Sequence, residues 1–408
     1  MTDRNSRSAG ALAPTRRVFL ASVGAFVAWA HMPRAAFAGT RDPRFVVVIL
    51  RGAMDGLAAV PPIGDPDYAK LRGDIAIGSP GMAGTVPLDG FFALNDAMPK
   101  LKQLYGSGEA LIVHAVATAY RDRSHFDGQD VLESGLTQPG ASRDGWLNRA
   151  VTALPRGEAV RPASGLAVSP TVPLVLRGGA PVFTWMPDGL MPVGMDTSDR
   201  LAGLYDHADP ELARAFAAGR TIDRMAAGGT AVKGGDITAS FRRIAIGAGR
   251  LLAEPDGPRI AAISFDGWDT HASEGPENGQ LGRRLGALDG ALDALKTELG
   301  PAWADTVVAV MTEFGRTAHV NGTDGTDHGT ATTAFLVGGA VKGGRVLADW
   351  PGLAPDKLYQ QRDLAPTTDL RAVLKGVLRD HLGIAEPVLA TDIFPGSIGI
   401  RPIAGLIA

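Results

Sequence analysis

Carboxylate and imidazole side chains stand at short spacing beside apolar segments of this chain. Asp269 and His271 are two positions apart just after residues 260–265, and Asp327 and His328 are adjacent shortly before a later apolar segment. Such donors at such spacing suit zinc, manganese or iron. The alternative interpretation of the first pair, in which Asp269 caps a helix and His271 lies in solvent, remains open.

Two further carboxylates directly follow apolar segments. Asp55 comes after residues 45–50, and Glu313 after residues 306–311. Asp55 lies in an Asp-Gly pair, which is also typical of a turn. Glu313 could instead pair with Arg316, an interaction that contributes only about 0–1 kcal/mol at a surface. Loops that only face solvent have no reason to concentrate Asp, Glu and His at the ends of successive apolar segments, which we predict below to be strands of one sheet. These carboxylates and imidazoles together therefore predict a metal or anion site, with Arg316 as an anion clamp.

Ser124 is a candidate nucleophile. It directly precedes a helix-like segment, and the unpaired backbone N–H groups at the start of a helix favour a bound anion. Arg121 and Arg123 could neutralise the charge of that anion. These features suit phosphoryl or sulfuryl transfer. Ser124 followed by Asp127 also resembles a capping box, and both interpretations stay open. His125 could bind a metal, orient a substrate or pack beside the sheet.

Continuous apolar segments must position these residues. Each is bounded by polar or turn residues, which is typical of a strand buried on both faces. Leucines spaced by three and four over residues 281–299 predict an amphipathic helix between two of the strands. Strands alternating with such helices predict an α/β fold with a largely parallel central sheet and helices on both faces, in which ligands collect beyond the carboxyl ends of the strands. The predicted strands are residues 45–50, 110–116, 260–265, 306–311 and 333–337.

Two other stretches complete the predicted organisation. Residues 150–240 are rich in Gly, Pro and Ala with weak periodicity, and we interpret them as an insertion or cap and not a separate domain. Residues 367–383 carry apolar side chains at helical spacing, which predicts a packing helix. We therefore expect one α/β domain over residues 39–408.

Composition limits the chemistry that is available. The chain has 408 residues, 45% hydrophobic and 20% charged, which is typical of a globular protein. Zero cysteines exclude disulfides, thiolate metal sites and a cysteine nucleophile. Any metal ligands are therefore oxygen and nitrogen atoms.

The amino terminus resembles a twin-arginine export signal. Arg16 and Arg17 precede an apolar run that reaches Ala30, and residues 36–38 form a small-x-small cleavage site. The run is shorter than the roughly twenty residues of a membrane span, so we expect a periplasmic or secreted protein without a transmembrane anchor in its mature form. Removal of residues 1–38 leaves 35 basic and 42 acidic side chains, a net charge near −7. That balance gives no electrostatic basis for binding nucleic acid.

The order of the motifs resembles that of domain-of-unknown-function family 1501. The resemblance covers nearly all of the mature chain. Besides the twin-arginine leader, it is carried by residues 50–57, 123–126, 269–271, 312–317, 327–329, 363–371 and 394–396. The family looks like a branch of the alkaline phosphatase and sulfatase superfamily, which implies an alkaline phosphatase-like fold and hydrolysis of phosphate or sulfate esters with one or two metals.

The resemblance also implies roles for single residues. Asp55 matches the aspartate ligand after the first strand, and Ser124 matches the nucleophile. Asp269 and His271 match an aspartate and a histidine of one metal, and His328 matches its last histidine. We add Asp327, which is adjacent to His328, to the candidate metal ligands.

This chain departs from the superfamily pattern at two places. Asp269 and His271 are separated by two positions, where relatives have four. Glu313-Phe314 stands where relatives have an adjacent aspartate and histidine, and phenylalanine cannot bind a metal. A second metal site would retain Asp55, Glu313 and Ser124, an oxygen-only set that suits magnesium, calcium or manganese better than zinc, or it would be empty.

We therefore expect an exported hydrolase of small anionic phosphate or sulfate esters that uses one or two divalent ions of zinc, manganese, magnesium or calcium. Ser124 would be the nucleophile or orient it, and Arg123 and Arg316 would clamp the anion. The alternative is a non-catalytic binding or assembly protein of the cell envelope that keeps the superfamily fold. Phe314 motivates this alternative, because it replaces a metal ligand. A third interpretation is a peripheral anion-binding protein whose arginines sense phosphate without hydrolysing it.

Overall fold

A computed structural model describes residues 41–78, 85–155, 165–187, 236–275 and 279–408, together with Ala213 and Ala217. The expected export signal at residues 1–38 lies outside the described residues, as does much of the expected insertion. Among the helices that the structure describes, none is both long and apolar enough to span a membrane.

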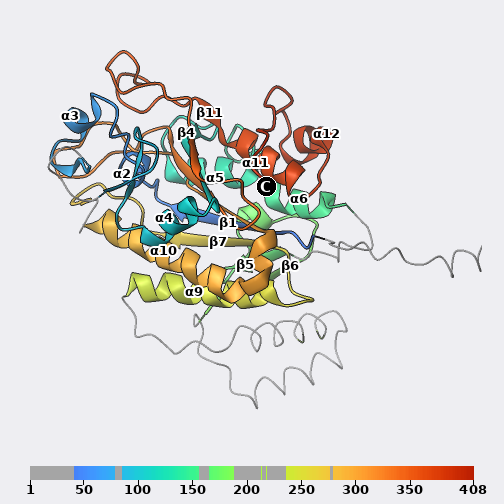
Figure 1. The fold of residues 1–408 in the computed structure, drawn as a ribbon. Helices are drawn as coiled ribbons and strands as arrows, with labels where there is room; N and C mark the ends of the chain where they lie inside the picture. Colours follow the sequence, from blue (N-terminus) through green and yellow to red (C-terminus); the bar gives the residue numbers. More distant parts are fainter. Residues whose placement is uncertain are drawn as a thin grey trace, which may run out of the picture. The chain divides into compact units, whose positions relative to one another are not determined.

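A nine-stranded central sheet carries the fold (Figure 1). Its strands are β1 (Arg44–Arg51), β4 (Ala110–Ala117), β5 (Gly165–Val168), β6 (Val182–Trp185), β7 (Ile260–Asp266), β8 (Thr306–Met311), β9 (Thr332–Val337), β10 (Arg345–Leu347) and β11 (Thr368–Asp369). The strand order is β10-β4-β9-β8-β1-β7-β5-β6, with β11 also paired to β4. The predicted α/β class, with a largely parallel sheet, is confirmed, and the five predicted strands are β1, β4, β7, β8 and β9.

Within this described sheet, β9 alone runs antiparallel to its neighbours. It pairs antiparallel with β4 and with β8, whereas the other strand pairs of the sheet are parallel. The chain therefore enters β9 at the same edge at which it leaves β1, β4, β7 and β8. A parallel β9 would place Asp327 and His328 at the opposite edge of the sheet, far from the other candidate residues.

Helices cover both faces of the sheet (Figure 1). On one face, α4 (Pro99–Gly106), α9 (Ile237–Ala253) and α10 (Gln280–Leu299) pack against alternate residues of β1, including Val46 and Val48. On the other face, α5 (His125–Ser134), α6 (Trp146–Ala153) and α11 (Leu370–Asp380) pack with Phe45 and Val47. This alternation follows from the two-residue period of a strand, and it explains why β1 is apolar at every position from Phe45 to Leu50, between its terminal arginines.

Two sequence-based boundaries differ from the structure. Strands β5 and β6 lie within residues 150–240 and extend the central sheet beyond β7, so this part of the stretch is not an insertion. Four-residue strands are too short to show periodicity. The helix expected over residues 367–383 begins later, as α11, because Thr368 and Asp369 pair with β4 and Asp369 then caps the helix.

Shorter elements fill the connections. They are α2 (Gly56–Ala59), α3 (Tyr68–Arg72), α12 (Glu386–Val388), the antiparallel pair β2 (Thr85–Pro87) and β3 (Ala93–Asn95), the 3-10 helices η1 (Gly73–Ile75), η2 (Leu174–Leu176) and η3 (Gly300–Asp305), and the π-helical turn η4 (Leu389–Ile393). The predicted leucine helix over residues 281–299 is confirmed as α10, whose leucines are buried against the sheet.

Candidate metal centre

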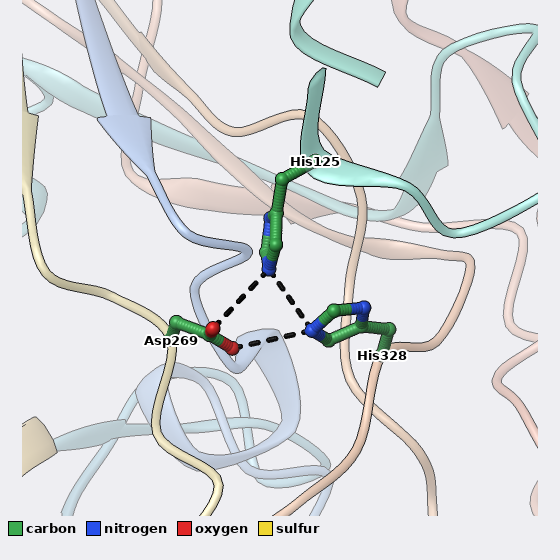
Figure 2. Close-up of side chains that lie close together, drawn as sticks. All are labelled: His125, Asp269 and His328. Atoms are coloured by element: carbon green, nitrogen blue, oxygen red, sulfur yellow. Dashed lines mark hydrogen bonds and ion pairs between the residues drawn. The ribbon is translucent and has the colours of Figure 1, made fainter. Parts of the chain in front are cut away.

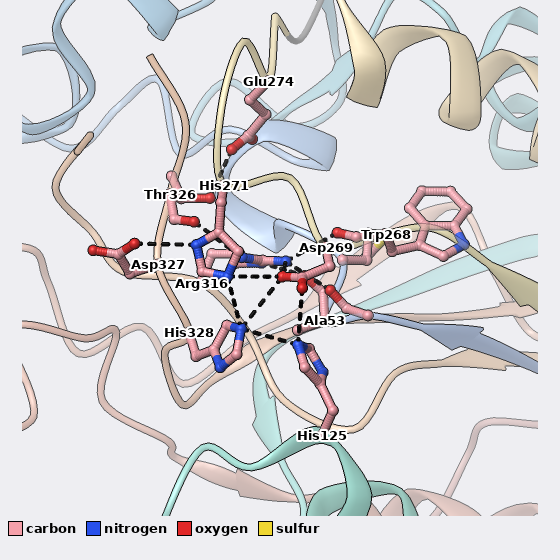
Figure 3. A network of polar contacts seen from close by, with 12 residues as sticks. Ala53, His125, Trp268, Asp269, His271, Glu274, Arg316, Thr326, Asp327 and His328 are labelled. Atoms are coloured by element: carbon pink, nitrogen blue, oxygen red, sulfur yellow. Dashed lines mark hydrogen bonds and ion pairs between the residues drawn. The ribbon is translucent and has the colours of Figure 1, made fainter. Parts of the chain in front are cut away.

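Four side chains from three distant segments converge at one edge of the sheet (Figure 3), and Figure 2 shows His125, Asp269 and His328 from close by. His125 is the first residue of α5, which follows β4. Asp269 and His271 lie in the loop that leaves β7, and His328 lies in the loop that enters β9. The antiparallel direction of β9 is what brings His328 to the other three residues.

His125, Asp269 and His328 each offer a ligand atom within 4.8 Å of the others, as a shared ion requires, and His271 contacts two of these three residues. Nε2 of His328 lies 2.9 Å from Nε2 of His125 and 2.9 Å from Nε2 of His271. Oδ1 of Asp269 lies 3.0 Å from Nε2 of His271 and 3.3 Å from Nε2 of His328. His125 Nε2 is 3.4 Å from Oδ2 of the same carboxylate. A tetrahedral ion with bonds of about 2.0–2.1 Å needs ligand atoms roughly 3.3 Å apart.

The other ring nitrogen of each histidine determines its tautomer. Nδ1 of His125 lies 2.8 Å from Oε1 of Glu313, Nδ1 of His271 lies 3.1 Å from Oδ1 of Asp327, and Nδ1 of His328 lies 2.8 Å from the carbonyl oxygen of Arg123. Carboxylates and carbonyls only accept hydrogen bonds, so each Nδ1 carries the hydrogen and donates it. In the neutral rings, each Nε2 then presents a lone pair.

The lone pair of His328 thus faces those of His125 and His271 at contact distance, beside the carboxylate of Asp269. Without a cation this arrangement is repulsive, whereas around a divalent ion it is a ligand set whose rings are oriented by acceptors behind them. Three imidazoles and one carboxylate suit zinc or another transition metal better than magnesium or calcium. The side chains of His125, Asp269, His271 and His328 remain 22%, 42%, 45% and 25% exposed, so a substrate could approach the ion from solvent.

Glu313 does not join the ligand atoms. Its side chain is fully buried behind His125, and its Oε1 also accepts hydrogen bonds from the backbone N–H of Gly52 and from Nε2 of Gln129. The hydroxyl of Thr312 donates to Oε2. Burial by itself would raise the pKa of Glu313, but the hydrogen bonds from His125, Gln129 and Thr312 outweigh it and hold the pKa below its usual value. The expected ligand Glu313 is instead the carboxylate that orients His125.

Asp327 occupies a similar position behind His271. Its Oδ1 accepts hydrogen bonds from Nδ1 of His271 and from Nδ2 of Asn321, at 3.1 and 3.2 Å. Asp327 was expected among the ligands because it is adjacent to His328. The structure places it in contact with the other histidine, as its orienting carboxylate.

Phe314 packs against the ligand histidines. Its ring stacks on that of His125, with centroids 5.0 Å apart and an interplanar angle of 27°, and it lies 5.4 Å from the ring of His328. Phe314 is buried in a small apolar cluster with Tyr120 and Val131. Phe314 therefore restricts the orientation of the His125 ring by packing against its face.

Asp55 lies away from the cluster. Its Oδ1 accepts from the backbone N–H groups of Leu57 and Ala58 and so caps α2, while its Oδ2 forms an ion pair with the fully buried Arg72. Both oxygens are occupied, and so are those of Glu313. The second metal site expected from Asp55, Glu313 and Ser124 is therefore not assembled among these residues.

Arg316 is buried, and its guanidinium is saturated by protein acceptors (Figure 3). It donates to the carbonyl oxygens of Gly52, Ala53, Trp268 and Thr326, and it lies 2.5 Å from Oδ1 of Asp269. Burial would raise the pKa of Asp269, but Arg316 together with His271 and His125 outweighs it and the pKa is lowered. Arg316 thus orients a ligand and joins three loops, and it is not available as the expected anion clamp.

Arg123 was the second expected clamp, and its guanidinium is also engaged. Its Nε lies 2.9 Å from Oδ2 of Asp363, and its Nη2 lies 2.7 Å from the same oxygen and 2.6 Å from Oε1 of Gln360. What Arg123 offers to the cluster is its backbone carbonyl, which accepts from His328.

Ser124 is the N-cap residue of α5, directly before His125. Its side chain makes no capping hydrogen bond. Asp127 instead accepts from the hydroxyl of Tyr120 at 3.3 Å, so the expected capping box with Asp127 does not form. The first N–H groups of α5 therefore have no side-chain cap from Ser124.

Comparison with protein families identifies this chain. Residues 110–391 match the family described as "Protein of unknown function (DUF1501)". The chain belongs to this family. No curated protein matches the sequence.

Several solved structures resemble this DUF1501 protein at low identity. A putative sulfatase from Bacteroides thetaiotaomicron is 10% identical over 86% of this chain and 72% of its own, with a TM-score of 0.42. A phosphonate monoester hydrolase of Agrobacterium radiobacter is 13% identical over 84% and 74%, with a TM-score of 0.35. A protein in the alkaline phosphatase superfamily from Vibrio parahaemolyticus is 12% identical over 77% and 64%, with a TM-score of 0.37. At such scores, the roles of the site residues depend on the geometry alone.

Sequence reasoning missed the residues that support the ligands of this DUF1501 protein. Gln129 is one of them, because it donates to Glu313, which in turn accepts from His125. A signal for Gln129 was present, since it lies four positions after His125 and so on the same face of α5. Asp363 begins one of the segments that carry the family resemblance, but no local spacing indicated its contact with Arg123, 240 positions away.

Proposed function

We propose that this protein is an exported metal-dependent hydrolase of phosphate or sulfate esters. One observation carries the proposal. Nε2 of His328 lies 2.9 Å from Nε2 of His125 and from Nε2 of His271, and the carboxylate of Asp269 lies 3.0 to 3.4 Å from these three atoms at a partly exposed edge of the sheet. Each ring carries its hydrogen on Nδ1, where a carboxylate or a backbone carbonyl accepts it. That arrangement fits a divalent ion, and the exposed side fits a substrate.

When bound, a divalent ion polarises the phosphoryl or sulfuryl oxygen and neutralises part of its charge. The chain supports this chemistry by keeping the ligands rigid. Glu313, Asp327 and the carbonyl of Arg123 hold the three rings, and Arg316 holds Asp269. Rings that are held in this way need little reorganisation as charge develops in the transition state.

In this proposal, the substrate anion lies between the cluster and the start of α5. The uncapped N–H groups and the dipole of this ten-residue helix favour negative charge there, and they take the place of the two arginines that are already engaged. The oxygen of Ser124, or of a water that Ser124 orients, forms a bond to phosphorus or sulfur and gives up its proton. The bond to the ester oxygen breaks, and the leaving alcohol takes up one proton. Where Ser124 is the nucleophile, a water then hydrolyses the phosphoryl- or sulfuryl-serine, which releases the acid and restores the hydroxyl.

The proposed location follows from the leader at residues 1–38. A twin-arginine signal would export the folded protein to the periplasm or the medium, where it would meet small anionic esters. The acidic mature chain gives no basis for nucleic acid as a partner.

Aryl esters provide the direct test. The protein is stripped with a chelator, reloaded separately with zinc or manganese, and assayed against 4-nitrophenyl phosphate and 4-nitrophenyl sulfate. We expect the metal-loaded protein to turn over at least one of the two esters. The chelator should abolish this turnover, and the His328→Ala variant should show none. Absence of turnover with either ester and either metal, in protein shown to hold the metal, would contradict the hydrolase.

A non-catalytic envelope protein remains the second candidate. The observation that favours it is the engagement of Asp55 with Arg72 and of Glu313 with His125, which leaves neither carboxylate for a second ion. Metal analysis separates the candidates in part. A protein that holds no stoichiometric metal after purification without chelator, and gains none on titration, would favour the binding role.

A further inference from the structure

Asp363 lies outside the ligand set, yet it joins the two segments that flank the cluster. Its side chain is fully buried, and its Oδ2 accepts from Nε of Arg123 at 2.9 Å and from the hydroxyl of Thr330 at 2.7 Å. Arg123 stands two positions before the ligand His125, and Thr330 stands two positions after the ligand His328. A single carboxylate oxygen therefore links the loop before α5 to the loop before β9.

The position of Asp363 is itself well determined. Its backbone forms antiparallel bridges with Thr317 and with Tyr359, and it exchanges two hydrogen bonds with Tyr359 at 2.8 and 3.0 Å. Nη1 of Arg362 lies 3.2 Å from the other carboxylate oxygen. The carboxylate is thus an anchor that does not depend on the cluster.

Arg123 has an unusual backbone. Its φ is +63°, in the left-handed region that residues with a side chain rarely adopt. In this conformation its carbonyl accepts the hydrogen of Nδ1 of His328 at 2.8 Å. The carbonyl is the acceptor that turns Nε2 of His328 toward His125 and His271.

We infer that Asp363 is a positioning residue for the metal centre. By binding the guanidinium of Arg123, it holds this residue in the left-handed conformation in which its carbonyl orients His328. In this inference, the guanidinium of Arg123 restrains its own backbone through Asp363 and does not contact the substrate. This inference rests on the proposed metal site.

Its energetic consequence is a change in metal affinity. If Arg123 leaves the left-handed region in the metal-free protein, it must return to that region when the ion binds. The apparent metal affinity is then the intrinsic affinity multiplied by the fraction of metal-free molecules in which Arg123 is left-handed. Supporting residues of this type usually change metal affinity about 10- to 100-fold.

The first test compares two matched aspartates. Asp363→Asn keeps the shape of the side chain and removes its charge. Asp369→Asn does the same to an aspartate that pairs with Arg371 in the same stretch of chain and that has no contact with the cluster. Zinc affinity is measured by competition with a chromophoric chelator. We expect about tenfold weaker binding for Asp363→Asn, and for Asp369→Asn a change of less than about twofold.

The second test separates the backbone of Arg123 from its side chain. Arg123→Gly and Arg123→Ala both remove the guanidinium, but only glycine adopts a positive φ without a steric cost. We expect Arg123→Ala to bind zinc about tenfold more weakly than Arg123→Gly, as the left-handed preference predicts. Equal affinities of the two variants would overturn the inference.

The experiment separates this inference from the proposed site. If the unmodified protein binds no zinc, the metal site itself is wrong. If it binds zinc and the Asp363 and Arg123 variants bind equally well, only the positioning role is wrong. If Asp363→Asn does not fold, the two Arg123 variants decide, because both leave Asp363 in place.

Discussion

At the scale of the residue, the hydrogen on each imidazole decides what the cluster can bind. Three different acceptors, the Glu313 carboxylate, the Asp327 carboxylate and the Arg123 carbonyl, place all three hydrogens on Nδ1. If one of these rings carried its hydrogen on Nε2 instead, it would donate to a neighbour and the pair would be a simple hydrogen bond. The acceptors therefore decide whether the three rings present lone pairs that an ion can bind.

Glu313→Gln tests this directly. The glutamine keeps the shape of the buried side chain but loses the charge that holds the hydrogen on Nδ1 of His125. We expect zinc affinity to fall about 10- to 100-fold, measured by chelator competition. Glu298→Gln, at a partly exposed glutamate that pairs with Arg250, provides the control and should bind zinc normally. Unchanged affinity in Glu313→Gln would show that Glu313 does not orient the ligand.

His114 gives a pH prediction that does not involve the cluster. It is fully buried, its Nε2 lies 2.9 Å from the carbonyl oxygen of Val60, and its Nδ1 accepts from the N–H of Ala115. Burial lowers the pKa of His114 from 6.5 to about 4. Above pH 6.5 the folded and unfolded states are both neutral at this residue. Between pH 6.5 and 4 only the unfolded state takes up the proton, so the free energy of unfolding falls as the pH falls.

The magnitude follows from the two pKa values and is about 3 kcal/mol when the pH reaches 4. His114→Gln cannot titrate and should lose this component. Urea unfolding of both proteins from pH 7 to pH 4, with chelator present throughout, measures the difference. Parallel pH profiles of the two proteins would show that His114 does not contribute.

At the scale of the element, short helices and strand direction decide which carboxylates reach the cluster. Asp55 follows β1 at the correct edge of the sheet, yet it turns its oxygens to the N–H groups of α2 and to Arg72. His328 precedes its strand, and it reaches the cluster because β9 is antiparallel. Proximity to the edge of the sheet is therefore necessary for a ligand but not sufficient.

Asp55→Ala tests the structural role of this cap. It would leave the buried Arg72 without its closest partner, which costs about 3–5 kcal/mol of unfolding free energy. Asp236→Ala is a matched control. Like Asp55, Asp236 caps a helix by accepting from the N–H groups two and three positions later, but its side chain is exposed to solvent. The loss there should be about 1 kcal/mol. Both are measured by chemical denaturation in chelator.

The same Asp55→Ala variant, where it is folded, should keep its zinc affinity, since Asp55 contacts Arg72 and not the cluster. The opposite pattern, normal stability with lost zinc binding, would return Asp55 to the ligand set.

At the scale of the whole molecule, a bound ion would connect segments that are far apart in sequence. His125 follows β4, Asp269 and His271 follow β7, and His328 precedes β9. An ion that binds only the folded arrangement stabilises it in proportion to the logarithm of its concentration. Stability and metal content should therefore be linked.

Zinc removal should lower the melting temperature. At a free zinc concentration about 100 times the dissociation constant, the stabilisation is about 2.7 kcal/mol, and it disappears in chelator. Calorimetry at several zinc concentrations measures it, and His328→Ala should show no dependence on zinc in this range. A melting temperature of the unmodified protein that does not change with zinc would argue against a metal that binds only the folded protein.

The class of the fold and the residue types of the site could be predicted from the amino-acid sequence. Continuous apolar segments such as residues 45–50 are stable only when covered on both faces, so the α/β arrangement could be predicted from them. Asp269, His271 and His328 could be selected because imidazoles and carboxylates at the ends of strands have few purely structural reasons to gather there. The leucine spacing of α10 was likewise a local property.

The direction of β9, and with it the place of His328, could not be predicted, because strand direction depends on which strands pair and not on local composition. Only the tertiary structure separated the carboxylate that faces the ligands, Asp269, from those that stand behind them or elsewhere, Glu313 and Asp55. That distinction depends on distances of a few ångströms between residues up to about 260 positions apart, and on which buried arginine or N–H group lies nearest. No spacing along the chain encodes these contacts.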